Sequence, residues 1–284
     1  MTDFPSILFP GDLPLLEEDF EFFRDRLLER AGIDLKDGKK SLVQARLGAH
    51  LRSIGLKGFA EYRRRLEGLA PDDGEWQIFV NLLTTNKTDF FREPAHFKFL
   101  LETFLPKWRK AGGKHLKVWS AACSTGQEPY TLAMCLKAAL PPECDFSILA
   151  TDIDTAVLKE ARNAVYPRHL LSQIPVEHRN ALSFGSGEIE GWMRIRPDWR
   201  KHVSFRTHNL IEGEPPPEGP FDVIFCRNVL IYFSRETIVQ VVGNLARSIG
   251  PDGVFMISHS ESLHGLPTPW QNIRPSVLVK KKRA

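Results

Sequence analysis

Short apolar segments alternate with amphipathic segments along the C-terminal part of the chain, and this alternation restricts the fold more than any other feature of the sequence. We expect strands at residues 117–121, 146–150, 221–226, 254–258 and 277–280. Between them we expect helices at residues 129–140, 154–164 and 234–248. Strands that alternate with helices form parallel sheets covered by helices. The sequence therefore predicts an α/β fold with a doubly wound sheet.

Residues 165–205 interrupt this alternation. Two short apolar segments, 181–184 and 192–196, flank a turn that contains Gly185, Ser186 and Gly187, and this pattern predicts a β-hairpin in a small antiparallel insert. Trp192 and Trp199 either fill a small core under this hairpin or hold a bound peptide. We favour the core for both tryptophans.

The N-terminal part of the chain has the spacing of helices. Apolar residues recur every three or four positions in four groups, which are Phe20, Phe23, Leu27 and Leu28; Val43, Leu47, Leu51 and Ile54; Ile78, Leu82 and Leu83; and Phe97, Leu100, Leu101, Phe104 and Leu105. Pro94 suits the first turn of the last of these helices. We therefore predict a helical domain at residues 1–85, a linker and seam helix at 86–112, and an α/β domain at 113–284 that contains the insert.

Polar side chains follow the predicted strand 221–226 directly. Arg227, Asn228 and Tyr232 lie in the segment Cys-Arg-Asn-Val-Leu-Ile-Tyr-Phe, which begins where the strand ends. In open α/β sheets, ligands bind in the crevice outside the carboxyl ends of the strands. These three side chains are therefore candidates for a ligand site.

The loop 120–128 follows the first predicted strand and contains a single glycine, Gly126. It lacks the three glycines of a dinucleotide fingerprint and the Gly-Lys-Ser/Thr of a phosphate-binding loop, so a pyrophosphate ligand is disfavoured. A tight turn between a strand and a helix still offers backbone amides to a polar ligand. An ordinary loop is the alternative.

Asp152 and Asp154 end the second predicted strand. A carboxylate at this position accepts hydrogen bonds from the ribose diol in nucleoside-binding α/β folds, whereas a helix N-cap is the alternative. We assign the ribose role to Asp152 and the cap to Asp154. A nucleoside with a diol but no pyrophosphate suggests S-adenosylmethionine, whose positive charges Glu128 could meet and whose carboxylate Arg92 could bind.

The chain resembles the chemotaxis-receptor glutamate O-methyltransferases of the CheR type over nearly its whole length. Six blocks carry the resemblance in the right order, at residues 84–93, 120–130, 150–154, 208–210, 226–233 and 258–263. The resemblance implies a Rossmann-like methyltransferase domain behind an all-α domain, with S-adenosylmethionine as cofactor. It also implies a cofactor site lined by Asn86, Thr88, Arg92, Glu128, Asp152, Asn209, Leu210, Arg227 and Asn228.

The implied reaction is transfer of a methyl group to glutamate side chains of a chemoreceptor, which gives methyl esters for sensory adaptation. Tyr232 would lie beside the transferred methyl group, and Tyr232 and Arg92 are the predicted catalytic residues. A glutamate carboxylate has a pKa near 4.3, so it is a nucleophile at neutral pH without a general base. A methyltransferase that acts on another protein or a small carboxylate, or a regulator that binds S-adenosylmethionine without turnover, is the alternative.

Charge is segregated in the helical region although the whole chain carries a net charge of only +3. Residues 1–35 contain three basic and nine acidic side chains, a net of −6, and residues 36–65 contain nine basic and two acidic ones, a net of +7. In the family that the chain resembles, methylation sites lie on glutamate-rich helical bundles, which a basic face would attract. We predict that Arg46 and Arg52 bind the receptor, with a solvated surface as the alternative. A receptor tail peptide could bind at the insert.

Other classes of protein fit the sequence poorly. The four cysteines show no Cys-x-x-Cys pair and no histidine at zinc-site spacing, so we expect no metal and a reduced compartment. His96, His202, His208 and His259 are interpreted as packing or capping residues. The segment 1–5 lacks the features of a signal peptide, and no apolar run approaches a membrane span. We therefore expect a cytoplasmic protein without a nucleic-acid or membrane partner.

Overall fold

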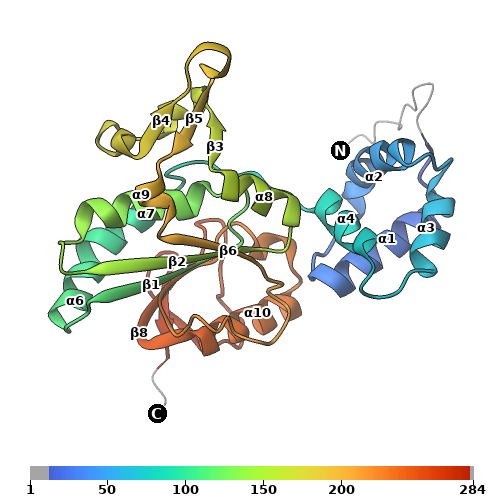
Figure 1. Cartoon of the computed structure of the whole chain (residues 1–284). Coiled ribbons are helices and arrows are strands. Elements are labelled where there is room, and N and C mark those ends of the chain that lie inside the picture. Colours follow the sequence, from blue (N-terminus) through green and yellow to red (C-terminus); the bar gives the residue numbers. More distant parts are fainter. Residues whose placement is uncertain (1–12, 282–284) are drawn as a thin grey trace, which may run out of the picture. The chain divides into compact units, whose positions relative to one another are not determined.

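The computed structural model describes residues 13–281, so the expectation about residues 1–5 lies outside the described residues. The chain forms two compact units (Figure 1). The first comprises Met1–Thr85 together with the short segment Tyr232–Ser234, and the second comprises Asn86–Ile231 and Arg235–Ala284. No helix within residues 13–281 is long and apolar enough to cross a membrane.

The first unit is all-helical. Its helices are α1 (Glu17–Ala31), η1 (Asp37–Lys39), α2 (Lys40–Ser53), α3 (Phe59–Glu67) and α4 (Gly74–Leu83). Phe23 lies at the centre of its core, where its ring contacts the rings of Phe59, Tyr62 and Phe79. The amphipathic spacing of the apolar residues thus brings three helices together around one aromatic side chain.

Two details of this unit differ from the sequence prediction. Leu28 and Ile78 are 40% and 41% exposed, so neither belongs to the buried face of its helix. The basic run at residues 63–65 conceals helix α3, whose buried face consists of Phe59, Tyr62 and Leu66. A helix of nine residues contains too few apolar positions to show a clear period beside so many charges.

A seven-stranded sheet forms the centre of the second unit. Its strands are β1 (His115–Ala121), β2 (Asp145–Asp152), β6 (Val203–Thr207), β7 (Phe221–Phe225), β8 (Ile249–Met256), β9 (Trp270–Arg274) and β10 (Val277–Lys280). They lie in the order β6-β2-β1-β7-β8-β10-β9. The first five are parallel to their neighbours, whereas β10 runs antiparallel to β8 and β9. The predicted doubly wound α/β fold is confirmed.

Helices cover this sheet. They are α5 (Pro94–Phe99), the π-helical turn η2 (Leu100–Phe104), α6 (Leu105–Lys110), α7 (Gln127–Ala139), α8 (Thr155–Asn163), α9 (Pro197–Arg200) and α10 (Arg235–Ser248). In Figure 1, α7 and α8 cover one face of the sheet and α10 covers the other. The segment 94–110 contributes Phe97, Leu100 and Leu105 to the main core, so it belongs to this unit and does not act as a free linker.

Strands β6 and β9 were missing from the sequence prediction. Both lie at the two edges of the sheet, and most of their side chains are exposed or half-buried. The prediction relied on continuous apolar runs, which mark strands buried on both faces. The side chains of an edge strand can stay in contact with water, so such a strand needs no continuous apolar run.

The predicted insert is present as a second sheet, β3-β5-β4, which stands apart from the large sheet in Figure 1. Its strands are β3 (Val165–Pro167), β4 (Leu182–Phe184) and β5 (Trp192–Ile195), and the short helices η3 (Arg168–Gln173), η4 (Val176–Ala181) and η5 (Gly187–Ile189) connect them. Strands β4 and β5 pair antiparallel, as predicted. Trp199 packs into the main core, but Trp192 is 46% exposed, so the core prediction for Trp192 is wrong.

The strand order reverses its direction at β1. From β1 the chain adds β2 and β6 on one side and β7 and β8 on the other. In open α/β sheets, the carboxyl ends of the strands at such a reversal are where ligands bind. The polar segments that the sequence singled out in the second unit follow the parallel strands β1, β2, β6, β7 and β8 or precede α5.

Candidate functional site

The loop after β1 is a tight turn that places Glu128 in the first turn of α7. The backbone N–H groups of Ala122, Cys123, Ser124 and Gly126 donate to acceptors within the protein. Ala122, Ser124 and Gly126 all have positive φ angles. A Cβ atom on Gly126 would lie 2.9 Å from the hydroxyl of Tyr166 and 3.0 Å from the Cβ of Ala161, so only glycine fits there. The single glycine of this loop is therefore explained by close packing against Tyr166 and Ala161, without a phosphate-binding role.

Asp152 lies at the end of β2 and is 7% exposed. Its carboxylate accepts hydrogen bonds from the backbone N–H groups of Ser124, at 2.8 Å, and Asp154, at 3.0 Å. Burial raises the pKa of the Asp152 carboxyl to about 6, against the opposing effect of those amides. Each oxygen still has a lone pair for another donor, so the residue can accept the two hydroxyls of a diol.

Asp154 caps helix α8, as the sequence analysis predicted. Its side chain accepts hydrogen bonds from the backbone N–H groups of Ala156 and Val157. Its other oxygen accepts from the side-chain amide of Asn86 at 2.6 Å. Asp154 therefore holds both the helix and the segment that begins the second unit.

Asn86 is one of the predicted cofactor residues, and the structure brings it close to the loop after β1. Its backbone oxygen accepts a hydrogen bond from the hydroxyl of Ser124 at 2.9 Å. The backbone N–H of Ser124 also donates to the carboxylate of Asp152. Ser124 therefore contacts both Asn86 and Asp152. Thr88 lies two positions further along the same segment and is half-buried.

Arg227, directly after β7, connects two carboxylates. Its guanidinium lies 2.9 Å from Glu128 and 3.1 Å from Glu93, and it also donates to the backbone oxygen of Arg92. The side chain is only 2% exposed. Glu128 in turn accepts from the hydroxyl of Ser120 at 2.7 Å. One cation between two carboxylates leaves a net charge of −1, which favours a positively charged ligand.

Asn228 continues this segment with a φ angle of +59°. Its side-chain amide donates to the hydroxyl of Ser258, at the end of β8, at a distance of 2.7 Å. The residue therefore joins the loops that follow two neighbouring parallel strands. It is half-buried, and its predicted role in the cofactor site stays a prediction.

The remaining predicted cofactor residues lie on two other loops. The Arg92 side chain donates to the backbone oxygen of Lys87 at 3.0 Å, which folds the segment before α5 into a turn. Asn209 and Leu210 follow β6. The adjacent His208 donates its backbone N–H to the backbone oxygen of Asp152. Leu210 is 8% exposed, which suits an apolar wall.

Tyr232 is grouped with the first unit of the structure, whereas the predicted cofactor residues belong to the second unit. It ends the short helix η6 (Leu230–Tyr232) and belongs to the segment that is grouped with the first unit. There, the backbone oxygen of Tyr232 accepts from Asp34, and Phe233 bridges to Ile33. The predicted role of Tyr232 beside a methyl group stays a prediction.

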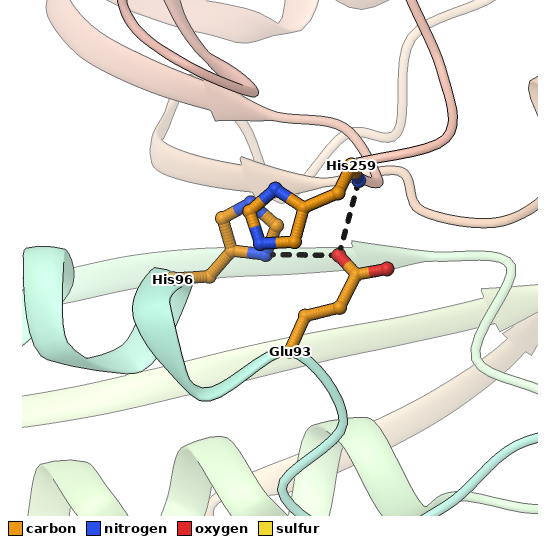
Figure 2. A group of neighbouring side chains, drawn as sticks. All are labelled: Glu93, His96 and His259. Carbon is orange, nitrogen blue, oxygen red and sulfur yellow. Dashed lines mark hydrogen bonds and ion pairs between the residues drawn. The ribbon is translucent and has the colours of Figure 1, made fainter.

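Glu93, His96 and His259 form the most compact group of potential metal ligands, with one donor atom from each residue within 4.8 Å of the others (Figure 2). The two imidazole rings stack with centroids 4.8 Å apart and planes 25° apart. Burial lowers the pKa of His96 to about 4. The Glu93 oxygen that faces His96 and His259 already pairs with Arg227. We therefore interpret the two rings as packing around this carboxylate.

The two predicted docking residues belong to α2 in the first unit and differ in their surroundings. Arg46 is half-buried and donates to the backbone oxygens of Leu82 and Thr84, at the end of α4. Arg52 is exposed and takes part in none of the ion pairs among residues 13–281. The acidic helix α1 neutralises part of the basic segment, because Arg63 pairs with Asp19.

The sequence analysis assigned no role to three polar residues near Arg227, which are Glu93, Ser258 and Glu261. Ser258 and Glu261 are buried, and Glu93 is half-buried. Each forms hydrogen bonds to the segment 227–230 or to its neighbours. Ser258 and Glu261 follow an apolar run directly, which is the same signal that revealed Arg227. Glu93 is next to Arg92 in the sequence, but its hydrogen-bond partner Ser258 lies far away in the sequence.

Comparison with protein families finds two matches that together span most of the chain. Residues 18–84 match the all-alpha domain of the CheR methyltransferases. Residues 86–278 match the S-adenosylmethionine-binding domain of the same family. The boundary between the two matches coincides with the boundary between the two units of the structure.

Individual proteins are similar over nearly their full lengths. The chain is 40% identical over 267 residues to chemotaxis protein methyltransferase 2 of Pseudomonas aeruginosa, which covers 92% of both proteins. It is 39% identical over 256 residues to the chemotaxis protein methyltransferase of Escherichia coli, which covers 89% of this chain and 87% of that protein. The corresponding protein of Borreliella burgdorferi is 35% identical, over 82% of this chain and 84% of that protein.

Proposed function

This chain belongs to the CheR methyltransferase family, and we propose that it transfers a methyl group from S-adenosylmethionine to glutamate side-chain carboxylates of a chemoreceptor signalling domain. The product is a glutamate methyl ester, which adapts the receptor's response. The observation that carries this proposal is a set of acidic groups in a domain of this family: the half-buried Glu93 and Glu128 flank Arg227, and the buried Asp152 ends β2.

The residues at the crevice fit the cofactor of the family. Glu93, Glu128 and Arg227 together carry a charge of −1, and Asp152 adds a second negative charge when it is ionised. S-adenosylmethionine presents a sulfonium and an ammonium group, so this excess of negative charge favours its binding. Asp152 would accept the ribose hydroxyls, and Leu210 would pack against the adenine ring.

The reaction asks little of the protein in proton transfer. The cofactor supplies an activated methyl group, and attack by a glutamate oxygen breaks the carbon–sulfur bond, whose electron pair stays on sulfur, so no proton moves. The glutamate is already ionised at neutral pH. The protein therefore contributes mainly orientation and exclusion of water, which can lower a barrier by about 7–11 kcal/mol.

We assign the two catalytic roles to Tyr232 and Arg92. Tyr232 would lie beside the transferred methyl group and orient it for attack. Arg92 would bind the carboxylate of the cofactor, with its side chain preset by the hydrogen bond to the Lys87 oxygen. A guanidinium suits a carboxylate because it offers several donors in one plane.

Receptor docking is assigned to the basic surface of α2 and α3. Arg52 and Arg64 are exposed on these helices, and a glutamate-rich receptor bundle carries the complementary charge. Arg46 stabilises helix α2, which carries part of this surface, through its hydrogen bonds to the end of α4. A partner that is attracted by charge associates faster at low salt, so methylation should slow as salt rises.

A receptor tail peptide is assigned to an edge of the insert. Strands β3 and β4 are the two edges of the small sheet, and an edge strand can pair with an added peptide strand. Phe184 of the edge strand β4 and Trp192 of the central strand β5 are 45% and 46% exposed and would contact the peptide. Receptors with and without their C-terminal tails should then differ in methylation rate, and equal rates would contradict this assignment.

The deciding experiment is methyl transfer from labelled S-adenosylmethionine to a purified chemoreceptor signalling domain. Label on the receptor that is released by mild base identifies carboxyl esters and supports the proposal. Label that resists base contradicts ester formation. Binding of S-adenosylhomocysteine without transfer to any receptor favours a regulator, and transfer to another protein favours a different substrate.

A further inference from the structure

One buried carboxylate, Glu261, holds the backbone of the segment that carries Arg227 and Asn228. Its Oε1 accepts from the backbone N–H of Leu230 at 2.8 Å, and its Oε2 accepts from the backbone N–H of Ser258 at 2.7 Å. The backbone N–H groups of Asn228 and Val229 also stabilise its negative charge. The side chain lies in the loop after β8 and is 8% exposed.

This arrangement matters because the backbone of the segment is unusual. Asn228 has a left-handed φ angle of +59°, which is uncommon for a residue with a Cβ atom. Leu230, in the turn that follows, and Ser258 are both buried. Buried backbone N–H groups need an acceptor, and Glu261 supplies one oxygen to each of these two residues.

Ser258 connects this carboxylate to the other acidic group of the crevice. Its backbone N–H donates to Glu261, while its hydroxyl donates to Glu93 at 2.9 Å and accepts from the side chain of Asn228. Ser258 is fully buried. The side chain of Asn228 is therefore held by Ser258, and its backbone is held by Glu261.

We propose that Glu261 is a positioning residue of the cofactor site, which sets the backbone of residues 228–230 so that Arg227 and Asn228 present their side chains to S-adenosylmethionine. This inference rests on the proposed function. Glu261 itself lies behind the backbone of the segment and would not touch the cofactor. Neither the family match nor the sequence analysis assigns it a role.

A carboxylate is the group that this position requires. Its two oxygens each accept one backbone N–H group, from Leu230 and from Ser258, and both act only as acceptors when the group is ionised. Glutamine has the same shape but replaces one oxygen by an NH₂ group, which would face an N–H donor. Burial raises the pKa of the Glu261 carboxyl, while the surrounding N–H groups act in the opposite direction.

The test is Glu261→Gln, measured by calorimetric binding of S-adenosylhomocysteine together with the thermal midpoint of the unliganded protein. We expect an affinity roughly ten-fold weaker, the scale of losing a hydrogen bond to a charged group. Faster amide hydrogen exchange at residues 228–230 should accompany the loss. Glu75→Gln is the matched control, because Glu75 is also 8% exposed and hydrogen-bonded but belongs to the helical unit.

A double-mutant cycle separates positioning from general loss of stability. If Glu261 acts through Asn228, then Glu261→Gln should weaken binding much less in an Asn228→Ala background than in the parent protein. Additive losses, or an equal loss of affinity in Glu75→Gln, would overturn the inference. An unchanged affinity in Glu261→Gln would do the same while leaving the proposed function intact, whereas failure of the parent protein to bind S-adenosylhomocysteine would contradict the proposed function itself.

Discussion

At the scale of single residues, the site depends on carboxylates whose partners are fixed by the fold. Asp152 accepts two backbone N–H groups, and Arg227 is shared between Glu93 and Glu128. Arg227 therefore holds both carboxylates in place, while its buried Nε atom has no hydrogen-bond partner within residues 13–281.

The first residue-scale prediction concerns pH. Burial raises the pKa of Asp152 to about 6, and only the ionised form accepts both ribose hydroxyls. Affinity for S-adenosylhomocysteine should therefore be full well above this pKa and fall as the pH falls through it. Calorimetry from mild acid to mild base measures this. In Asp152→Asn, affinity should be lower by about 1.5–3 kcal/mol at neutral pH and no longer vary with pH in this range. A retained slope would assign the titration to another group.

The second residue-scale prediction concerns Tyr232. If its hydroxyl orients the methyl group, then Tyr232→Phe should lower kcat by roughly 10-fold or more while the affinity for S-adenosylhomocysteine changes little. Rate measurements at saturating cofactor and calorimetry on the same protein separate the two effects. Equal losses in both quantities would instead indicate a role in folding or binding.

At the scale of elements, the loops at the carboxyl ends of β1, β2, β7 and β8 assemble the site. Hydrogen bonds join the loops pairwise, through Ser124 to Asp152 and through Asn228 to Ser258. The parallel sheet determines which loops meet, because it places the same ends of neighbouring strands at one edge. The loop after β1 also depends on contact with the insert, since Tyr166 of β3 donates to the oxygen of Thr125 at 2.8 Å.

Gly126 provides the element-scale prediction. In Gly126→Ala, the new Cβ would meet the hydroxyl of Tyr166 at 2.9 Å and would also occupy a φ of +94°. We expect a loss of unfolding free energy of about 2–4 kcal/mol, from the left-handed φ and from overpacking together. Chemical denaturation measures it.

Gly112→Ala is the control for this prediction. Gly112 has a similar φ of +87°, but no atom lies within 4 Å of its added Cβ. The variant should lose only the conformational part, about 1–2 kcal/mol. If both variants lost the same amount, the contact with the insert would have no energetic effect.

At the scale of the whole molecule, charge is distributed unequally between surfaces. The acidic helix α1 compensates part of the basic segment through Lys40 and Arg63, while Arg52 and Arg64 stay exposed. The two units thus divide the work in the proposed function. One carries the basic surface and the other carries the buried acidic site.

The whole-molecule prediction tests this division. Arg52→Glu combined with Arg64→Glu should slow methylation of a receptor domain by about 10-fold or more at low salt and much less at high salt, because charge acts mainly on association. Affinity for S-adenosylhomocysteine should stay at the parent value. Lys159→Glu with Lys201→Glu is the control, since it changes the net charge equally on exposed residues of the other unit. Slowing by the control pair to the same extent would assign the effect to net charge alone.

The sequence by itself determined the features that are encoded locally. Apolar runs predicted the buried strands, and a polar segment directly after a run predicted Asp152, Arg227 and Asn228 as neighbours of the site. The cap at Asp154 followed from its position before a helix and is confirmed. The hairpin of the insert followed from two short apolar segments around a glycine turn. Each of these inferences needs only the burial and hydrogen bonding of adjacent residues.

Only the tertiary structure decided which distant groups meet. Glu93 and Ser258 are 165 residues apart in the sequence yet share a hydrogen bond, and no local pattern encodes that pairing. Edge strands β6 and β9 also depended on the sheet that they join, because their exposed side chains carry no continuous apolar run. The exposure of Trp192 and the attachment of Arg46 to α4 have the same origin. Burial and pairing of such residues are set by neighbours that the chain brings together only when it folds.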